Sequence, residues 1–233
     1  MIVAFDTYYY EGFSYTVAGV FETWESEKVK YYVCSRRKGI DAEYKPGELY
    51  KRELPCIMQC LEKIDVDAIS SIVVDGFVWV VNDDGERVPG LGKRLQEAIA
   101  EKYEHHLSVI GIAKNPYHTK IPNCIEVCRG QSKQPLYVTC TEDFFTQHYA
   151  DEIKLMFGEF RIPNIIKAID TKTRNYCNDV NQEEDSSSIK QIIRENNNLN
   201  KTTTLGDLAI DMGDFEQFVS DVKEKGFEYE GAT

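Results

Sequence analysis

The sequence has no long hydrophobic run. None of its segments approaches the roughly 18 consecutive apolar residues that a membrane-spanning helix needs, so we expect no membrane partner. The first ten residues, MIVAFDTYYY, lack a basic segment and reach Asp6 at once, so we expect a first strand and not a signal peptide. With 42% hydrophobic and 28% charged residues, the composition is typical of a globular protein, and we expect a cytoplasmic monomer.

Several signatures of catalysis and metal binding are also missing. The chain has no P-loop, no dinucleotide-binding fingerprint and no nucleophile elbow. Its seven cysteines include no pair with the spacing of a zinc site, and we expect reduced thiols. The four histidines form no metal-binding spacing, and the turn at residues 82–85 has too few ligands for a calcium loop.

Basic residues are outnumbered by acidic ones. The chain has 39 acidic and 27 basic residues, and its net charge of −12 argues at first against a nucleic-acid partner. The charge is unevenly distributed, because residues 178–233 hold 13 acidic and 5 basic residues, a net of −8, which leaves −4 for residues 1–177. A nucleic-acid partner therefore stays open, without the support of a basic patch.

The hydrophobic pattern predicts an α/β fold. Strand-like segments at 1–10, 15–24 and 28–36 indicate an antiparallel meander. Strands are then expected at 70–81 and 107–114 and in a hairpin at 123–130 and 134–140. Helices are expected at 55–64, 91–103, 142–158 and 163–175, with Pro55 as a first helical residue. This order predicts a mixed sheet with helices on both faces.

A domain boundary is expected near Cys177. Residues 178–204 are polar and low in complexity, which predicts a linker, whereas residues 205–233 regain a short, acidic, possibly helical pattern. Two interpretations of this acidic tail are open. It either binds a protein partner or the protein's own groove, or it only makes the chain more soluble.

Acidic side chains lie where charge is costly. Asp6 lies inside the strand-like IVAFD, Asp75 ends IVVD, and Glu53 precedes a helix. These carboxylates either bind a hard cation such as Mg²⁺, which takes oxygen ligands, or only form hydrogen bonds at turns and a helix cap. Lys114 ends a buried strand, where it either faces a phosphate or reaches solvent. Asp170 is either a fourth ligand or an exposed helix residue.

The stretch EYKPGELYKRELP at residues 43–55 is distinctive. Pro46 and Gly47 favour a tight turn that presents the ring of Tyr44, and Glu53 follows directly. The pattern fits an aromatic wedge followed by a metal ligand, or a surface turn followed by a helix cap.

Together these pieces resemble the endonuclease V family, nucleases with a ribonuclease H-like fold. The resemblance covers about residues 1–177 and rests on segments in the family's order: AFDTYY, YKPGELYKRELP, IVVDG, GLGKRL, VIGIAKN, KQPLYVTC and RIPNIIKAID. It implies cleavage of a phosphodiester one nucleotide 3′ of a deaminated purine such as hypoxanthine, in DNA or RNA. The implied chemistry is Mg²⁺-dependent hydrolysis, with Mn²⁺ as a substitute, that leaves 5′-phosphate and 3′-hydroxyl ends.

The resemblance also implies roles for single residues. Asp6, Glu53 and Asp75 would hold the ion, Asp170 would assist, and Lys114 would stabilise charge near the scissile phosphate. The residues implied at the nucleic acid are the wedge Tyr44 with Pro46 and Gly47 in its turn, Gly76 beside the second aspartate, and Gly90 at a helix start.

The chain departs from the family after Asp75. The family has a histidine after its Asp-Gly pair, where this chain has Phe77, and the strand continues into a hairpin. This departure leaves a second hypothesis open, a catalytically weak nucleic-acid-binding protein of the same fold with a different base preference.

Overall fold

A seven-stranded mixed sheet forms the centre of the protein. The computed structural model describes residues 1–38 and 50–199, with side chains as far as Asn181. The strand order is β3-β2-β1-β4-β7-β9-β8, with β1, β4 and β7 parallel and the other neighbours antiparallel. The strands are β1 (Ile2–Tyr10), β2 (Phe13–Phe21), β3 (Tyr31–Lys38), β4 (Ser71–Asp75), β7 (Ser108–Ala113), β8 (Ile125–Val127) and β9 (Leu136–Cys140).

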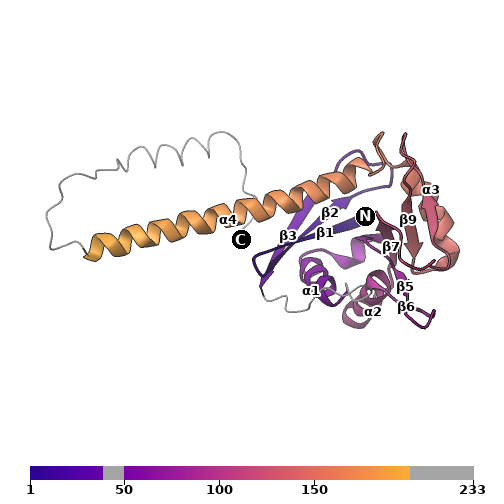
Figure 1. Cartoon of the computed structure of the whole chain (residues 1–233), viewed down its shortest axis with the longest axis horizontal. Helices are drawn as coiled ribbons and strands as arrows, with labels where there is room; N and C mark the ends of the chain where they lie inside the picture. The colour runs from indigo at the N-terminus through magenta and orange to yellow at the C-terminus, as the bar shows by residue number, and fades with distance from the viewer. Residues whose placement is uncertain (39–49, 200–233) are drawn as a thin grey trace. The chain divides into compact units, whose positions relative to one another are not determined.

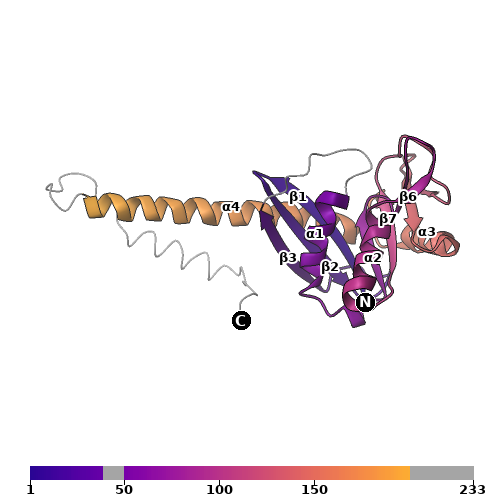
Figure 2. The ribbon, with the colours of Figure 1, turned by 90° about the horizontal axis from the view of Figure 1, so that it is seen from below.

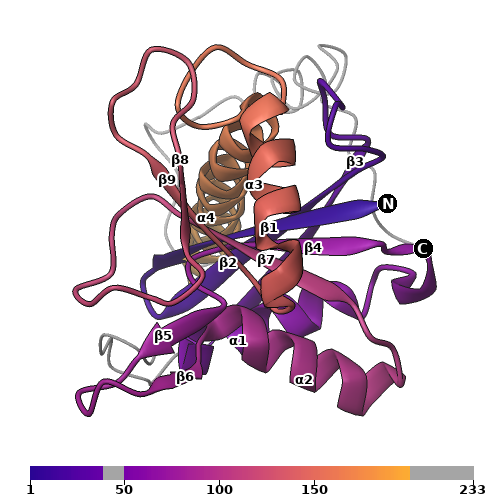
Figure 3. The same ribbon diagram turned by 90° about the vertical axis from the view of Figure 1, so that its right-hand side faces the viewer.

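Helices cover both faces of this sheet, as the sequence predicts. Figure 3 shows α1 and α2 on one face and α3 and α4 on the other, and Figure 2 shows α1 and α2 in front of the strands. The helices are α1 (Tyr50–Leu61), α2 (Leu91–Tyr103), α3 (Thr146–Leu155) and α4 (Asn164–Leu199), with 3₁₀ turns at Val66–Ala68 and Asp143–Phe145. The predicted meander of β1, β2 and β3 and the predicted hairpin of β8 and β9 are confirmed.

Alternation along the strands gives the sheet two hydrophobic cores. On β1, Val3 and Phe5 join the core under α1 and α2, whereas Ile2 and Ala4 join the core under α3 and α4. Because successive strand residues point to opposite faces, one apolar strand supplies both cores. The central strands are therefore held from both sides, which fixes the positions of the side chains at their ends.

Helix α4 crosses the sheet in close contact with β2. A Cβ atom at Gly19 would lie 2.5 Å from Cδ1 of Ile169, so only glycine lets the helix approach this closely. Thr173, one turn later on α4, is fully buried as well. This packing sets the position of Asp170, which lies between Ile169 and Thr173 on the same helix.

Strand β4 is shorter than the sequence predicts. It ends at Asp75, whereas we expected one strand over residues 70–81; Gly76 has a φ of 140° and turns the chain away. The following residues form the separate hairpin of β5 (Trp79–Val81) and β6 (Arg87–Pro89). The predicted hairpin is thus confirmed, but the break at Gly76 was missed because the apolar run continues past Asp75.

The helix boundaries differ from the prediction at two places. Helix α1 already includes Tyr50, so Pro55 lies inside the helix and is not its first residue. Helix α4 continues to Leu199 through residues 178–199, where the polar composition predicted a linker (Figure 1). This segment has no proline or glycine and several good helix formers, which explains the helix.

The chain divides into two compact units, Met1–Glu183 and Glu184–Thr233. The division lies six residues beyond Cys177, where we expected the boundary. Residues 205–233, the predicted acidic segment, lie outside the described residues. None of the helices in the described part is long and apolar enough to cross a membrane.

Candidate active site

The parallel strands bring three predicted site residues to one edge of the sheet. Phe5 of β1 lies opposite Val74 of β4, so Asp6 and Asp75 follow directly after the last paired positions. Asp75 in turn lies opposite Ile112 of β7, two residues before Lys114. Parallel pairing of β1, β4 and β7 therefore places two carboxylates and one ammonium side by side.

Lys114 contacts two carboxylates at the site. Its Nζ donates a hydrogen bond to Oδ2 of Asp75 at 2.7 Å and lies 4.0 Å from Oδ1 of Asp170. Burial lowers the pKa of Lys114, but the attraction and hydrogen bond of Asp75 outweigh it, so the pKa is raised and the side chain stays charged. Lys114 thus faces the carboxylates, and its contact with a phosphate stays a prediction.

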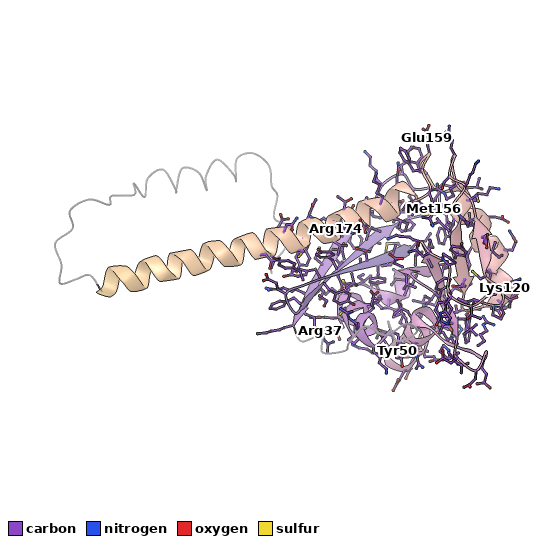
Figure 4. The ribbon with its side chains drawn as sticks, viewed as in Figure 1. Arg37, Tyr50, Lys120, Met156, Glu159 and Arg174 are labelled. Atoms are coloured by element: carbon purple, nitrogen blue, oxygen red, sulfur yellow. The ribbon has the colours of Figure 1, made fainter. Side chains whose placement is uncertain are left out.

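Helices from opposite faces supply the remaining acids. Glu53 lies in the first turn of α1, and Asp170 comes from α4 on the other face of the sheet. Figure 4 labels Tyr50 at the start of α1 and Arg174 on α4, which mark the two helices. Asp170 pairs with Arg174 one turn later, with Nε of the arginine 3.2 Å from Oδ2 of the aspartate. Four carboxylates thus surround one end of β4.

Burial and mutual repulsion make this carboxylate group unfavourable by itself. Burial, reinforced by the charges of Asp75 and Asp6, raises the pKa of Glu53 from 4.5 to about 8. Burial also raises the pKa of Asp6, as do the charges of Asp170 and Asp75. A hydrogen bond from the Thr173 hydroxyl has the opposite effect on Asp6 and lowers its pKa. The site holds more negative charge than Lys114 alone neutralises.

The chemistry of these carboxylates suits a hard cation. Their oxygen atoms are the ligands that Mg²⁺ prefers, and a bound cation would relieve the repulsion that raises the pKa of Glu53 and Asp6. Within the described part of the chain, no three His, Cys, Asp or Glu residues are arranged closely enough to hold a metal ion. Ion binding by Asp6, Glu53 and Asp75 therefore requires their side chains to turn toward one another.

A pocket of about 460 Å³ opens beside the carboxylates. We call it the Phe77 pocket; it is lined by Phe77, Tyr117, Tyr50, Gly76 and Gly90 together with Asp6, Glu53, Asp75 and Lys114. The rings of Phe77 and Tyr117 meet edge to face with centroids 5.7 Å apart. A Cβ at Gly90 would lie 2.8 Å from the carbonyl oxygen of Phe77, so this glycine keeps α2 close to the pocket wall.

The structure thus brings together seven of the ten predicted site residues. Asp6, Glu53, Asp75, Lys114, Gly76 and Gly90 line the Phe77 pocket, and Asp170 reaches Lys114 from the other side. Tyr44, Pro46 and Gly47 lie outside the described residues. Whether the wedge belongs to this site stays a prediction from the sequence.

The fold of this chain is similar to that of a solved structure. The crystal structure of an endonuclease V from Bacillus subtilis is 18% identical to this chain, with a TM-score of 0.54, and the match covers 78% of this chain and 81% of that one. The two proteins share a fold. The predicted α/β fold, a mixed sheet with helices on both faces, is thereby confirmed.

Other comparisons add little to this match. A protein of unknown function from Archaeoglobus fulgidus is 9% identical, with a TM-score of 0.42, over 74% of this chain and 95% of that one. Neither a family model nor a curated protein sequence matches the chain.

The structure adds residues that the sequence did not single out. Thr173 contacts Asp6, Arg174 pairs with Asp170, and Tyr117 forms one wall of the Phe77 pocket. Thr173 and Arg174 follow Asp170 by three and four residues, which is the spacing of one helix face and a signal that the sequence contained. Tyr117 lies in an irregular segment after β7, where no sequence periodicity indicates its position.

Proposed function

We propose that this protein is a metal-dependent endonuclease that hydrolyses a phosphodiester bond 3′ of a deaminated purine, such as hypoxanthine, in DNA or RNA. The observation that carries the proposal is the position of Asp6, Glu53 and Asp75 beside Lys114. Burial and the mutual repulsion of these negative carboxylates raise the pKa of Asp6 and Glu53, and a bound cation would offset this repulsion. The shared fold with an endonuclease V supports the same conclusion.

In this proposal the carboxylates of Asp6, Glu53 and Asp75 hold Mg²⁺, or Mn²⁺ in its place, and Asp170 assists from α4. The ion, when bound, supplies an activated water and stabilises the leaving oxygen of the phosphodiester. Lys114, held at Asp75 by its hydrogen bond, offers its ammonium to the negative charge that develops on the phosphate.

The Phe77 pocket is the place for the extruded base in this proposal. Its aromatic walls, Phe77 and Tyr117, offer a stacking surface, and Gly76 and Gly90 also line it. Tyr44, on its Pro-Gly turn, would fill the gap that the base leaves in the strand.

The ends of the product test this chemistry. Cleavage in Mg²⁺ of an end-labelled oligonucleotide with one deoxyinosine should leave a 5′-phosphate and a 3′-hydroxyl. The downstream fragment should therefore be joined by a ligase without prior phosphorylation, and EDTA should abolish cleavage. A product with a 3′-phosphate, or cleavage that persists in EDTA, would contradict the proposal.

The aromatic walls of the Phe77 pocket also favour a second candidate, the catalytically weak binding protein. Phe77 stands where the related family has a histidine, so the pocket can hold a base that differs from hypoxanthine. This candidate predicts binding of nucleic acid without turnover in any divalent metal, and multiple turnover on any substrate excludes it.

A further inference from the structure

A second and larger pocket opens on the α4 side of the carboxylates. We call it the Phe160 pocket; its volume is about 970 Å³, and Lys114 and Asp170 line one end of it. Its other lining residues come from the turn after β8, from the segment that leads into α4 and from the first turn of α4: Gly130, Gln131, Ser132, Glu159, Phe160, Arg161, Ile162, Ile166 and Lys167. Since Lys114 also lines the Phe77 pocket, the carboxylates lie between the two pockets.

The segment that carries Phe160 is held by one buried arginine. The Arg129 side chain, on a residue only 3% exposed, donates hydrogen bonds to the carbonyl oxygens of Lys154, Met156, Gly158, Phe160 and Arg161. Figure 4 shows Met156 and Glu159 in this segment, just before α4. A loop fixed through its own carbonyl groups presents its side chains in a set position, which lowers the entropic cost of binding.

This fixed loop presents an aromatic ring beside a positive charge. Phe160 is 67% exposed, although a large apolar side chain gains by burial. The ammonium of Lys167, on the first turns of α4, lies 5.6 Å from the centre of the Phe160 ring. Arg161 next to it is fixed by hydrogen bonds to the carbonyl oxygens of Pro135 and Lys114.

The two features together fit one class of ligand. An exposed ring can stack on the face of a nucleobase, and an adjacent ammonium can pair with a phosphate. Base faces are accessible in a single strand and covered by neighbouring base pairs in a duplex. The ligand that matches this ring and charge is therefore an unpaired polynucleotide.

We propose that the Phe160 pocket binds unpaired nucleotides of the substrate strand, on the opposite side of the scissile phosphate from the Phe77 pocket. The inference rests on the proposed nuclease function, because an internal phosphodiester held at the carboxylates has nucleotides on both sides. One side of the strand then enters the Phe77 pocket, and the other runs along α4. A base stacks on Phe160, and its phosphate meets Lys167.

Binding in EDTA, where no cleavage takes place, tests the stacking contact. Fluorescence anisotropy of the full chain with a labelled single-stranded oligonucleotide should show a Kd that rises about 5- to 100-fold in Phe160→Ala. The matched control is Phe144→Ala, which removes another highly exposed phenylalanine, one that does not line the pocket. Equal affinities of Phe160→Ala and the wild type would overturn the proposal.

Oligonucleotides with one abasic position test the same contact from the ligand side. In the wild type, loss of one particular base should weaken binding, whereas in Phe160→Ala the same loss should have no further effect. Such non-additive losses of affinity would show that the missing base contacts the Phe160 ring. Full additivity of the two losses at every position would contradict stacking on Phe160.

Salt dependence tests the phosphate contact. Lys167→Gln should reduce the slope of log K against log salt by about 0.7, the value for one phosphate of a single strand. Lys120→Gln, which removes an exposed charge outside both pockets, should leave the slope unchanged. Equal slopes for Lys167→Gln and the wild type would overturn the role of Lys167.

A parallel cleavage assay separates this inference from the proposed function. Mg²⁺-dependent cleavage by the wild type, together with unchanged binding by Phe160→Ala, overturns the Phe160 pocket and leaves the nuclease intact. Weakened binding by Phe160→Ala without cleavage in any metal supports the pocket and overturns the nuclease.

Discussion

Burial and the neighbouring charges of Asp75 and Asp6 all raise the pKa of Glu53. The side chain lies in the first turn of α1 close to Asp6 and Asp75, and its pKa of about 8 means that ionisation costs the folded protein free energy. Residues that reduce stability in this way are typical of functional sites, since a ligand restores the balance. The raised pKa of Glu53 therefore supports the proposed cation site.

Replacement of Glu53 by glutamine should stabilise the metal-free protein at high pH. The folded-state pKa lies above the unfolded value of 4.5, so ionisation lowers the wild-type stability as pH rises through 4.5 to 8. In EDTA, the unfolding free energy of Glu53→Gln should match the wild type at pH 4 and exceed it by about 5 kcal/mol at pH 9, since the pKa rises from 4.5 to about 8 and each pKa unit is worth about 1.4 kcal/mol. Urea unfolding measures both.

Glu62→Gln is the matched control for this experiment, because Glu62 forms only an exposed ion pair with Lys102 on the surface. It should show no gain at pH 9. Mg²⁺ should stabilise the wild type more than Glu53→Gln. If Glu53→Gln follows the wild type at every pH, the described carboxylate group is wrong.

Replacement of Asp75 by asparagine should abolish Mg²⁺-dependent cleavage and leave the fold intact. The change keeps the shape of the side chain but removes a charge that the ion needs and that Lys114 pairs with. Circular dichroism checks the fold, and the end-labelled oligonucleotide assay checks cleavage. Full activity of Asp75→Asn would remove Asp75 from the mechanism.

At the scale of elements, the contact between α4 and β2 determines where Asp170 lies. Gly19→Ala should cost about 1–3 kcal/mol of unfolding free energy, because the new methyl group meets Ile169 at 2.5 Å. Combined with Ile169→Ala, which removes the opposing atoms, Gly19→Ala should cost much less. Denaturant unfolding of the four proteins in this cycle gives the coupling free energy.

Ile165→Ala provides the comparison for that cycle, because Ile165 is buried on the same helix one turn earlier and does not contact Gly19. The losses of unfolding free energy caused by Ile165→Ala and by Gly19→Ala should add in the double variant. Additive costs for Gly19→Ala and Ile169→Ala as well would mean that α4 does not cross β2 at this glycine.

The sequence predicted elements better than it predicted their ends. Alternation and helical periodicity located the meander, the β8–β9 hairpin and the helices, because these signals are local. The break after Asp75 was missed, since it depends on the backbone conformation of one glycine within a continuous apolar run. The helix over residues 178–199 was missed because its polar composition resembles a linker, although the segment contains no proline or glycine.

Local sequence patterns could not show that the site residues lie close together. The sequence named Asp6, Glu53, Asp75, Lys114 and Asp170, but their meeting depends on the strand order, in which β1 and β4 pair although more than sixty residues separate them. No periodicity encodes such a pairing. The two pockets also combine residues from several separate segments and were found only in the structure.

At the scale of the whole molecule, charge is the property that most affects a nucleic-acid partner. Residues 200–233 carry 8 acidic and 3 basic residues, a net of −5. If these acids compete with phosphates for the site, a chain ending at Leu199 should bind single-stranded oligonucleotides more tightly at low salt, and the gain should shrink at high salt. Anisotropy at two salt concentrations measures this.

A full-length chain with these eight acids replaced by their amides is the matched control. It should reproduce the gain if charge is the cause. Unchanged affinity in both proteins would leave the tail as a solubilising extension.

Cleavage of matched oligonucleotides tests the central claim most directly. One end-labelled set would carry a single deoxyinosine in DNA, a second inosine in RNA, and a third no lesion, each with Mg²⁺ and with EDTA. We predict a Mg²⁺-dependent cut one nucleotide 3′ of the lesion in at least one of the first two sets, and no such cut in the third. Absence of cleavage in all three would contradict the nuclease and favour the binding protein with its altered Phe77 pocket.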